Sequence, residues 1–286
     1  MRAWLVLLLL TLAPATAEAQ PQLRWSEDHA RVHPASYVAQ TSGVAAALVF
    51  DQLYHPPPDA TFRGSWFFDG DLRDALLTGD PDEREAAAAV SDALLLAMIA
   101  WPLVDSLLVA GAIRGSSDVA WQVLSISTEV IAADFIASTL IKLLIDRERP
   151  HGEECTVEDR VRRPGRCGRR GRTRSFYSGH ASAAWSYAGT ICMNHVHVPL
   201  YGELAADTLA CGAAVMTASI IGVLRVLADR HWATDVLIGS VVGLATGLAL
   251  PYLLHYGWDR SESDGVAFTT APVSEQPAML SFGGSF

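Results

Sequence analysis

The 286-residue chain contains a single lysine, Lys142, beside twenty arginines. Lysine carries a compact point charge on a flexible stem, whereas arginine presents a planar fork of donors. A chain that uses arginine almost everywhere and keeps one lysine is consistent with a site that needs a point charge at Lys142. Charged residues of all kinds make up only 18%, and half of the residues are hydrophobic. This composition is apolar for a soluble enzyme and polar for a protein embedded entirely in lipid.

Basic residues are outnumbered by acidic ones over most of the chain, which has a net charge of -10. Residues 147–174 are the exception: they hold ten arginines against five acidic residues, a local +5, which leaves -15 for the remainder. Nucleic-acid binding requires a broader basic face, so we expect no nucleic-acid partner. A basic segment in an acidic chain indicates an anionic ligand, although charge alone also fits a solvated loop.

Cysteine is scarce, with four residues. The chain starts with a positive residue, an apolar stretch over residues 3–13 and a small-residue cleavage site before residue 20, which predicts a secretory signal peptide over residues 1–19. In an exported chain, cysteines form disulfides more often than metal sites. Cys155 and Cys167 enclose a short arginine-rich loop and are our predicted disulfide. Cys192 and Cys211 form a weaker second pair, with free buried thiols as the alternative.

Long apolar segments begin after an N-terminal region, residues 20–88, of mixed composition. A short helix over residues 69–77 is either interfacial or an ordinary packing helix. Long helices are predicted over residues 93–113, 118–145, 178–193, 205–227 and 232–256. These segments predict an all-α bundle of about five to six long apolar helices over residues 89–258, embedded in a membrane, with a tail over residues 259–286. Asp105, Glu129 and Asp134 interrupt the apolar segments, and they either face the bundle interior or indicate a soluble bundle.

Three groups of polar residues lie at the ends of these segments. His231 and Asp235 are four residues apart, so they share a face if a helix begins near Asp229. An aspartate that binds one ring nitrogen of a histidine fixes the tautomer, and the other nitrogen is then free to attack or to accept a proton. Arg225 could hold an anion against that nitrogen. An interfacial histidine among solvated charges is the alternative for this segment taken alone.

The other two groups add donors for an anion. Lys142 and Arg149 are seven residues apart and are expected on one helix face near its end. Ser178, Gly179 and His180 place a hydroxyl group and exposed N–H groups at the start of a helix, where the helix dipole favours an anion. So many positive donors around two histidines suit a phosphoryl group or an oxyanion that resembles it.

Three blocks of the sequence resemble, in the same order, the motifs of the type 2 phosphatidic acid phosphatase (PAP2) superfamily: K-x6-R-P at 142–150, Y-S-G-H at 177–180 and R-x5-H-x3-D at 225–235. That superfamily also contains bacterial non-specific acid phosphatases and vanadium haloperoxidases. The resemblance spans about residues 90–256, and a match of three blocks is far more specific than a match of one.

The resemblance implies a role for each matched residue. His231 resembles the nucleophile that accepts the phosphoryl group, Asp235 the carboxylate that orients it, and His180 the general acid that protonates the leaving alcohol. The others resemble the phosphate-binding residues: Lys142, Arg149, Ser178, Gly179 and Arg225. Tyr177 replaces the usual proline and Leu224 the usual serine, and these departures put substrate affinity in doubt more than chemistry.

We therefore predict a phosphatase without a metal or another cofactor, which hydrolyses a phosphomonoester or pyrophosphate of a lipid through a phosphohistidine. Residues 237–254 carry no charge and are nearly long enough to cross a bilayer, which favours a lipid substrate. The alternatives are a soluble periplasmic acid phosphatase, a vanadate-dependent haloperoxidase and a catalytically silent membrane protein. His195 and His197 form an H-x-H pair with no third ligand nearby, so we expect no metal site there.

Two signals for localisation conflict. The ten arginines indicate the cytoplasm by the positive-inside rule, whereas the signal peptide and the Cys155–Cys167 pair indicate the periplasm. We favour a bacterial inner-membrane protein whose active site faces the periplasm, with a soluble periplasmic protein as the alternative and no obligatory protein partner. In the membrane arrangement, residues 38–54 are not expected to cross the bilayer and the tail lies in the cytoplasm.

Overall fold

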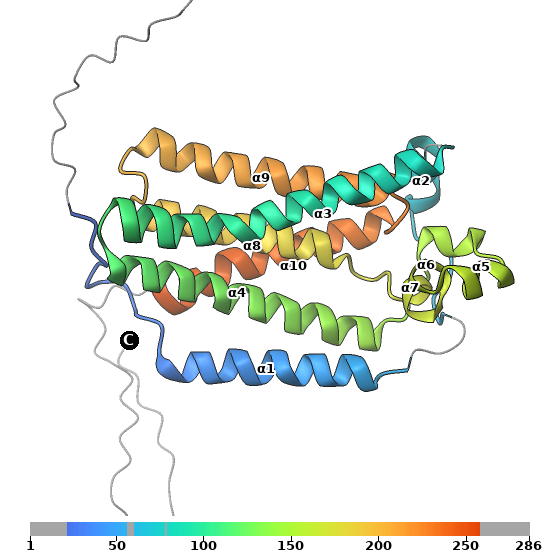
Figure 1. The fold of residues 1–286 in the computed structure, drawn as a ribbon, viewed down its shortest axis with the longest axis horizontal. Coiled ribbons are helices and arrows are strands. Elements are labelled where there is room, and N and C mark those ends of the chain that lie inside the picture. Colours follow the sequence, from blue (N-terminus) through green and yellow to red (C-terminus); the bar gives the residue numbers. More distant parts are fainter. Residues whose placement is uncertain (1–21, 56–59, 78, 258–286) are drawn as a thin grey trace, which may run out of the picture.

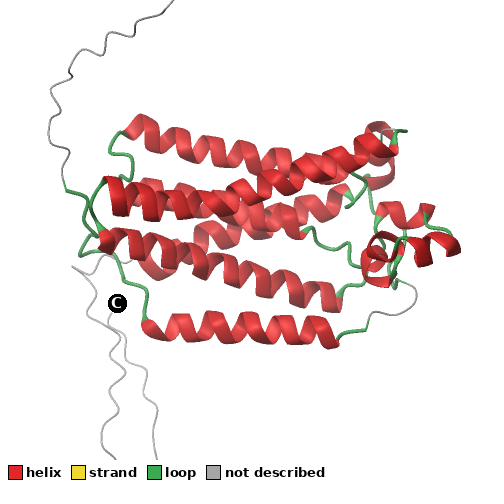
Figure 2. Cartoon of the chain, in the orientation of Figure 1, coloured by secondary structure: helices red, strands yellow, loops and turns green. Residues whose placement is uncertain are grey.

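The computed structural model describes residues 22–55, 60–77 and 79–257. These parts of the chain are helical and contain no strand, apart from an isolated bridge between Phe62 and Arg147 (Figure 2). The predicted all-α bundle is therefore confirmed. The predicted signal peptide, residues 1–19, and the tail from residue 259 lie outside the described residues.

Six long helices run along the bundle (Figure 1). They are α1 (Pro34–Leu53), α3 (Pro81–Leu103), α4 (Ser117–Leu144), α8 (Gly179–His197), α9 (Leu204–Leu227) and α10 (Ala233–Pro251). The short helices α2 (Asp69–Leu76), α5 (Val157–Arg162), α6 (Pro164–Cys167), α7 (Arg169–Thr173) and η2 (Pro150–Glu154) gather at one end. We call this the loop end; the far end carries residues 22–33, 114–116 and 198–203.

Local capping residues decide where the long helices begin. Asp80 accepts a hydrogen bond from Asp82 N at 2.8 Å, and Pro81 occupies the first turn, so α3 begins earlier than the predicted residue 93. Pro102 lies near the end of α3, and the chain continues as a π-helix, η1 (Val104–Ile113). Ser116 caps α4, whose predicted range differs by only one residue at each end.

Helices α8 and α10 are in backbone contact because glycines of α10 face carbonyl groups of α8. A Cβ atom at Gly243 would lie 2.0 Å from the Ser182 carbonyl oxygen, and one at Gly247 would lie 2.3 Å from that of Ser186. No larger side chain fits at such distances, as in other closely packed helix pairs. These contacts hold α8 and α10 side by side along much of their length.

Among the described residues, four segments are long and apolar enough to cross a membrane: Pro81–Ile113, Ser117–Leu144, Leu204–Leu227 and Ala233–Tyr256. The three acidic residues that interrupt the apolar segments, Asp105, Glu129 and Asp134, point inward: Glu129 is 2.8 Å from His255 Nε2 and Asp134 accepts a hydrogen bond from Ser182. Large apolar side chains such as Leu107 and Val241 are exposed instead. An apolar exterior with paired acids inside is the pattern of a membrane bundle and supports association with a membrane.

Two disulfides join parts of the described chain. Cys155 is bonded to Cys167, with the sulfur atoms 2.05 Å apart, which closes the arginine-rich loop at the loop end. Cys192 is bonded to Cys211 and links α8 to α9. The first disulfide therefore stabilises the loop end, and the second holds α8 and α9 together covalently.

Candidate active site

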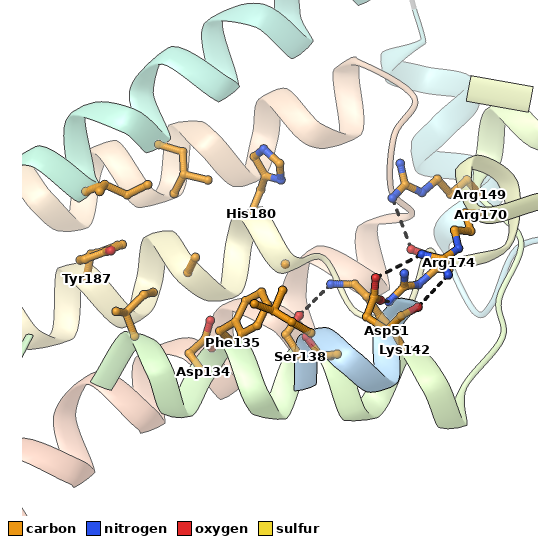
Figure 3. A pocket seen from close by; sticks show the side chains of 17 residues that line it. Asp51, Asp134, Phe135, Ser138, Lys142, Arg149, Arg170, Arg174, His180 and Tyr187 are labelled. Carbon is orange, nitrogen blue, oxygen red and sulfur yellow. Dashed lines mark hydrogen bonds and ion pairs between the residues drawn. The ribbon is translucent and has the colours of Figure 1, made fainter. Parts of the chain in front are cut away.

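A cavity of about 620 Å³ opens near the loop end (Figure 3). One part of its wall is made of ionisable side chains: Asp51, Asp134, Lys142, Arg149, Arg170, Arg174 and His180. Another part is apolar: Leu48, Leu95, Ile99, Ile131 and Phe135. The cavity therefore suits a ligand with an anionic end and an apolar body.

Lys142 lies in the last turn of α4 and reaches the start of α8. Its Nζ atom donates to Ser138 Oγ at 2.7 Å. A Cβ atom at Gly179 would lie 2.7 Å from the same Nζ atom, so a glycine at that position leaves room for the lysine. No carboxylate of the described chain lies within ion-pair distance of Lys142, which leaves its charge available to a ligand.

Arg149 lines the same cavity but does not share a helix with Lys142. The prediction of a shared helix face is wrong because α4 ends at Leu144 and the next residues pair with Phe62, which accepts a hydrogen bond from Glu148 N at 2.9 Å. Burial, and then the like charge of Arg225, lower the pKa of Arg149 to about 10. As with Lys142, no described carboxylate forms an ion pair with this guanidinium.

The start of α8 is as predicted: Ser178 is the N-cap, and its Oγ accepts a hydrogen bond from Ala181 N at 3.4 Å. His180 follows in the first turn. Its Nε2 lies 2.9 Å from Oδ1 of Asp92 in α3, and the same oxygen accepts a hydrogen bond from Arg225 at 2.9 Å. Asp92 therefore joins the second and third sequence blocks. Sequence reasoning missed it, because it lies in an alanine-rich helix without a motif.

His231 lies in the turn before α10, which begins at Ala233, close to the predicted start at residue 232. The condition that a helix begins near Asp229 is therefore not met. Asp229 has a φ of 57°, which ends α9, and His231 N donates to the Arg225 carbonyl oxygen at 3.3 Å. His231 Nδ1 lies 2.8 Å from the Ser175 carbonyl oxygen and 3.9 Å from Asp235. A carbonyl oxygen only accepts, so Nδ1 carries the proton and Nε2 presents its lone pair.

The surroundings of His231 keep its imidazole neutral. Burial, and then the positive charges of Arg149 and Arg225, lower the pKa of His231 well below its usual range. A neutral ring with an available Nε2 lone pair is the form that can act as a nucleophile. None of the described residues is hydrogen-bonded to that atom.

Asp235 is the third residue of α10 and fixes the segments around His231. It accepts hydrogen bonds from Trp232 N at 3.1 Å, from Ser175 Oγ and from Arg147 at 2.6 Å. Asp235 therefore holds Ser175, whose carbonyl group binds His231, in addition to lying near the ring itself. The expected direct hydrogen bond to the imidazole is replaced by this indirect contact.

Arg147 is a fully buried residue that sequence reasoning also missed. Its guanidinium forms an ion pair with Asp69 at 2.7 Å and lies 3.9 Å from the centre of the Trp66 ring. Asp69 also accepts a hydrogen bond from Thr234 N at 2.8 Å. Helix α2 is therefore a packing helix that supports the start of α10, which is one of the two alternatives expected for it. No spacing in the sequence linked Asp69 to residues so distant in the chain.

Tyr177 precedes the N-cap of α8 and is buried. Lys142 Nζ lies 6.0 Å from the centre of its ring, which is within the range of a cation–π interaction. The aromatic residue that replaces the usual proline thus contacts the lysine of the first block.

Comparison with known proteins gives one family. Residues 122–259 match the model of the PAP2 superfamily. No curated protein and no solved structure matches the chain. The matched segment runs from within α4 to beyond α10 and contains all eight predicted catalytic and phosphate-binding residues. Helices α1 and α3, with Asp51 and Asp92, lie outside it. Residues 122–259 of this chain therefore belong to the PAP2 superfamily.

Proposed function

We propose that this protein is a phosphatase that removes a phosphoryl group from a lipid phosphate through a phosphohistidine at His231. The observation that carries this proposal is the state of His231: its Nδ1 is bound to the Ser175 carbonyl oxygen at 2.8 Å, and its Nε2 has no partner among the described residues. Lys142 and Arg149 line the cavity near the start of α8. Neither forms an ion pair with a carboxylate of the described residues.

The proposed reaction has two steps. Nε2 of His231 forms a bond to phosphorus, the bond to the leaving oxygen breaks, and His180 donates a proton to that oxygen. His180 then accepts a proton from water, which attacks the phosphohistidine and releases inorganic phosphate and free His231. Lys142, Arg149 and Arg225 stabilise the negative charge in both transition states.

A lipid substrate is supported by the apolar part of the cavity wall, which includes Ile99, Ile131 and Phe135. It is also supported by the four helices that are long and apolar enough to cross a membrane. A phosphate bound near His180 could extend its apolar chain along this wall without leaving the bundle. A small soluble ester would leave the same surface uncovered.

Phosphate release by the purified full-length protein tests the proposal. Phosphatidate, phosphatidylglycerol phosphate, undecaprenyl diphosphate and a lipid A phosphate are compared with the soluble ester p-nitrophenyl phosphate. We expect kcat/KM for at least one lipid to exceed that for the soluble ester by about 10²-fold or more, because remote apolar contacts contribute binding energy. Equal values would support a soluble acid phosphatase. Bromide oxidation with added vanadate, without phosphate release, would support a haloperoxidase.

We further infer that the active site faces the periplasm. The Cys155–Cys167 disulfide at the loop end supports this orientation, because disulfides persist in oxidising compartments. Helix α1 begins and the last turn of the described chain ends at the far end, opposite the cavity (Figure 1). Helix α1 also packs along α4, so an embedded bundle would carry α1 across the membrane, which differs from our expectation for residues 38–54.

Reporter fusions test this orientation. Green fluorescent protein placed after Phe286 should fluoresce, because the tail would lie in the cytoplasm, and alkaline phosphatase at the same position should be inactive. The opposite pair of results would place the tail in the periplasm. If the tail lies in the periplasm and intact mass also shows that residues 1–19 have been removed, the protein would be a soluble periplasmic bundle instead.

A further inference from the structure

The residue after the first sequence block, His151, is buried at the loop end, with 1% of its surface exposed. Its Nδ1 atom lies 2.9 Å from the carbonyl oxygen of Asp229, two residues before His231. Its Nε2 atom lies 3.2 Å from the carbonyl oxygen of Arg166, the residue before Cys167. The ring therefore lies between the turn of the proposed nucleophile and the loop closed by the first disulfide. The proposed reaction gives this histidine no role.

The ring of His151 can donate only one hydrogen bond at neutral pH. Burial, and then the positive charge of Arg149, lower the pKa of His151 to about 4, so its imidazole is neutral. A neutral imidazole has one N–H, and both neighbours of this ring are carbonyl oxygens, which only accept. Nδ1 is closer to its acceptor than Nε2 is, so we assign the proton to Nδ1 and the hydrogen bond to the Asp229 carbonyl oxygen. Nε2 then has no proton to donate to the Arg166 carbonyl oxygen.

This hydrogen bond fixes the backbone of a turn that needs support. Asp229 has a φ of 57°, in the left-handed region that costs free energy for a residue with a side chain. Its carboxylate is buried and forms an ion pair with Arg73 of α2 at 2.8 Å. The side chain of Asp229 is therefore held by α2, and its carbonyl group by His151. Because His231 follows two residues later, a change in this turn would move the imidazole that attacks phosphorus.

The Cys155–Cys167 disulfide joins the two segments that enclose the His151 ring. Cys155 directly follows η2, which carries His151. Cys167 is the last residue of α6, and the Arg166 carbonyl group before it lies against Nε2 of the ring. The bond therefore limits how far the ring can move away from the Asp229 carbonyl group.

An ion-pair bridge connects the same loop with the same turn. Glu85 of α3 is paired with Arg166, and its carboxylate also accepts a hydrogen bond from Arg230 at 2.8 Å. Arg230 directly precedes His231. About half of this bridge is exposed, since 52% of the Glu85 side chain is accessible to solvent. We therefore expect it to contribute less than the buried hydrogen bond of the histidine.

We propose that His151 is a positioning residue, through which the loop closed by the Cys155–Cys167 disulfide holds the turn of His231 in place for attack on phosphorus. This rests on the proposed phosphatase function. His151 is not among the residues that line the active-site cavity, so its loss should slow formation of the phosphohistidine and leave phosphate binding unchanged. Displacement of a reacting atom by about 1 Å can lower a rate by about 10²-fold.

Three substitutions at His151 in the full-length protein test the hydrogen bond to Asp229. The amide nitrogen of asparagine takes the place of Nδ1, whereas that of glutamine takes the place of Nε2. His151→Ala and His151→Gln should lower kcat for the lipid phosphate that the parent hydrolyses fastest by about 10- to 100-fold, because the Asp229 carbonyl group loses its donor. His151→Asn should keep most of the parent kcat. The inhibition constant of inorganic phosphate should be the same in all four proteins.

The two disulfides provide a matched pair of variants. Cys155→Ser/Cys167→Ser removes the bond beside His151 and should lower kcat. Cys192→Ser/Cys211→Ser removes the bond between α8 and α9 and should leave the kcat of the folded protein as in the parent. Combining the first pair with His151→Ala should lower kcat by less than the product of the two separate losses, because both changes act on one contact.

Kinetics are measured below the melting temperature of the least stable variant, with far-UV circular dichroism as the control for folding. Equal kcat in the asparagine and glutamine variants would overturn the positioning role and leave the phosphatase intact, and this comparison decides even if the alanine variant does not fold. Equal losses from the two disulfide variants, a combined loss equal to the product, or weaker inhibition by phosphate in the His151 variants would also overturn it. No phosphate release by the parent from the lipids or from p-nitrophenyl phosphate would refute both proposals.

Discussion

Both ends of the bundle contain a buried histidine close to aspartates, but the two histidines are bonded differently. At the far end, His195 Nδ1 lies 2.6 Å from Asp207 and Nε2 lies 3.2 Å from Asp105. Tyr201 donates to Asp105 at 2.8 Å, so every polar group of this cluster has a partner. At the loop end, only one nitrogen of His231 is bonded, and the nearby cations Lys142 and Arg149 have no carboxylate partner in the described chain.

This difference shows how a site can be distinguished from a structural cluster. Buried polar groups in proteins are normally paired, and a fully paired network stabilises the fold. Unpaired cations beside a histidine with a free lone pair cost stability, which is expected where a ligand completes the pairing. We therefore propose that the far-end cluster stabilises the fold and that the loop-end group binds a ligand.

Helix α8 ends later in the chain than predicted. Residues 194–203 were expected to form a linker, but α8 continues to His197. His195 is held in the helix by its two aspartate partners, and the His197 ring stacks on Tyr256 with ring centres 4.5 Å apart. The part of the chain that the structure describes contains no group of three or more His, Cys, Asp or Glu side chains placed to hold a metal ion.

The largest effect on kcat/KM is expected when the proposed nucleophile is removed. His231→Ala should lower kcat/KM for a lipid phosphate by about 10⁴-fold or more, because no other group can form the covalent bond. Acid-labile labelling by a ³²P-substrate should disappear in this variant. Far-UV circular dichroism and the melting temperature control for folding. Labelling that persists would remove His231 from the mechanism.

The next effect concerns His180. His180→Ala should lower kcat/KM for alkyl phosphates by about 10² to 10⁴-fold, because the leaving alkoxide is no longer protonated. Esters with acidic leaving groups, such as p-nitrophenyl phosphate, need little protonation and should lose much less. Equal losses on both kinds of ester would mean that His180 only binds the phosphate.

The far-end histidine should show the opposite behaviour. His195→Ala leaves Asp105 and Asp207 buried without their partner, so the free energy of unfolding should fall by about 3–5 kcal/mol. The variant that remains folded should keep the kcat/KM of the parent, since His195 lies in the last turn of α8 and Asp207 in the first turn of α9, whereas the cavity lies by the start of α8. Chemical denaturation and steady-state kinetics at a temperature below its melting point measure the two quantities. A large loss of kcat/KM in folded protein would refute the division between the two ends.

The smallest effect is in the pH profile. A nucleophilic histidine must be neutral, and the pKa of His231 is lowered by burial and by neighbouring cations. The usual pKa of histidine is about 6.5. Because the pKa of His231 is lower, its neutral form persists at pH values below that. In the free enzyme, kcat/KM corrected for substrate ionisation should not decline with a pKa near 6.5 as the pH falls; its acidic limb should lie lower. A limb centred near 6.5 would contradict the lowered pKa.

The sequence alone predicted the long helices after residue 117 and the residues of the candidate site. Apolar runs of this length are local signals, as is a helix start at Ser178, so α4, α9 and the start of α8 were predicted closely. The three blocks could be recognised because their lysine, arginines and histidines are spaced closely within each block. Their chemistry does not depend on knowing the fold.

Only the tertiary structure decided how these residues are held and charged. Ser175 lies two residues before the second block, but no pattern in the sequence showed that its carbonyl group binds His231. The Asp92 carboxylate between His180 and Arg225 and the Asp51 carboxylate beside Arg174 come from segments with no spacing that relates them to the blocks. Their positions follow from the packing of α1 and α3 against the matched segment, because a contact between residues far apart in the chain leaves no periodic pattern in the sequence. Which cations remain unpaired, and therefore which can bind phosphate, is a property of that packing.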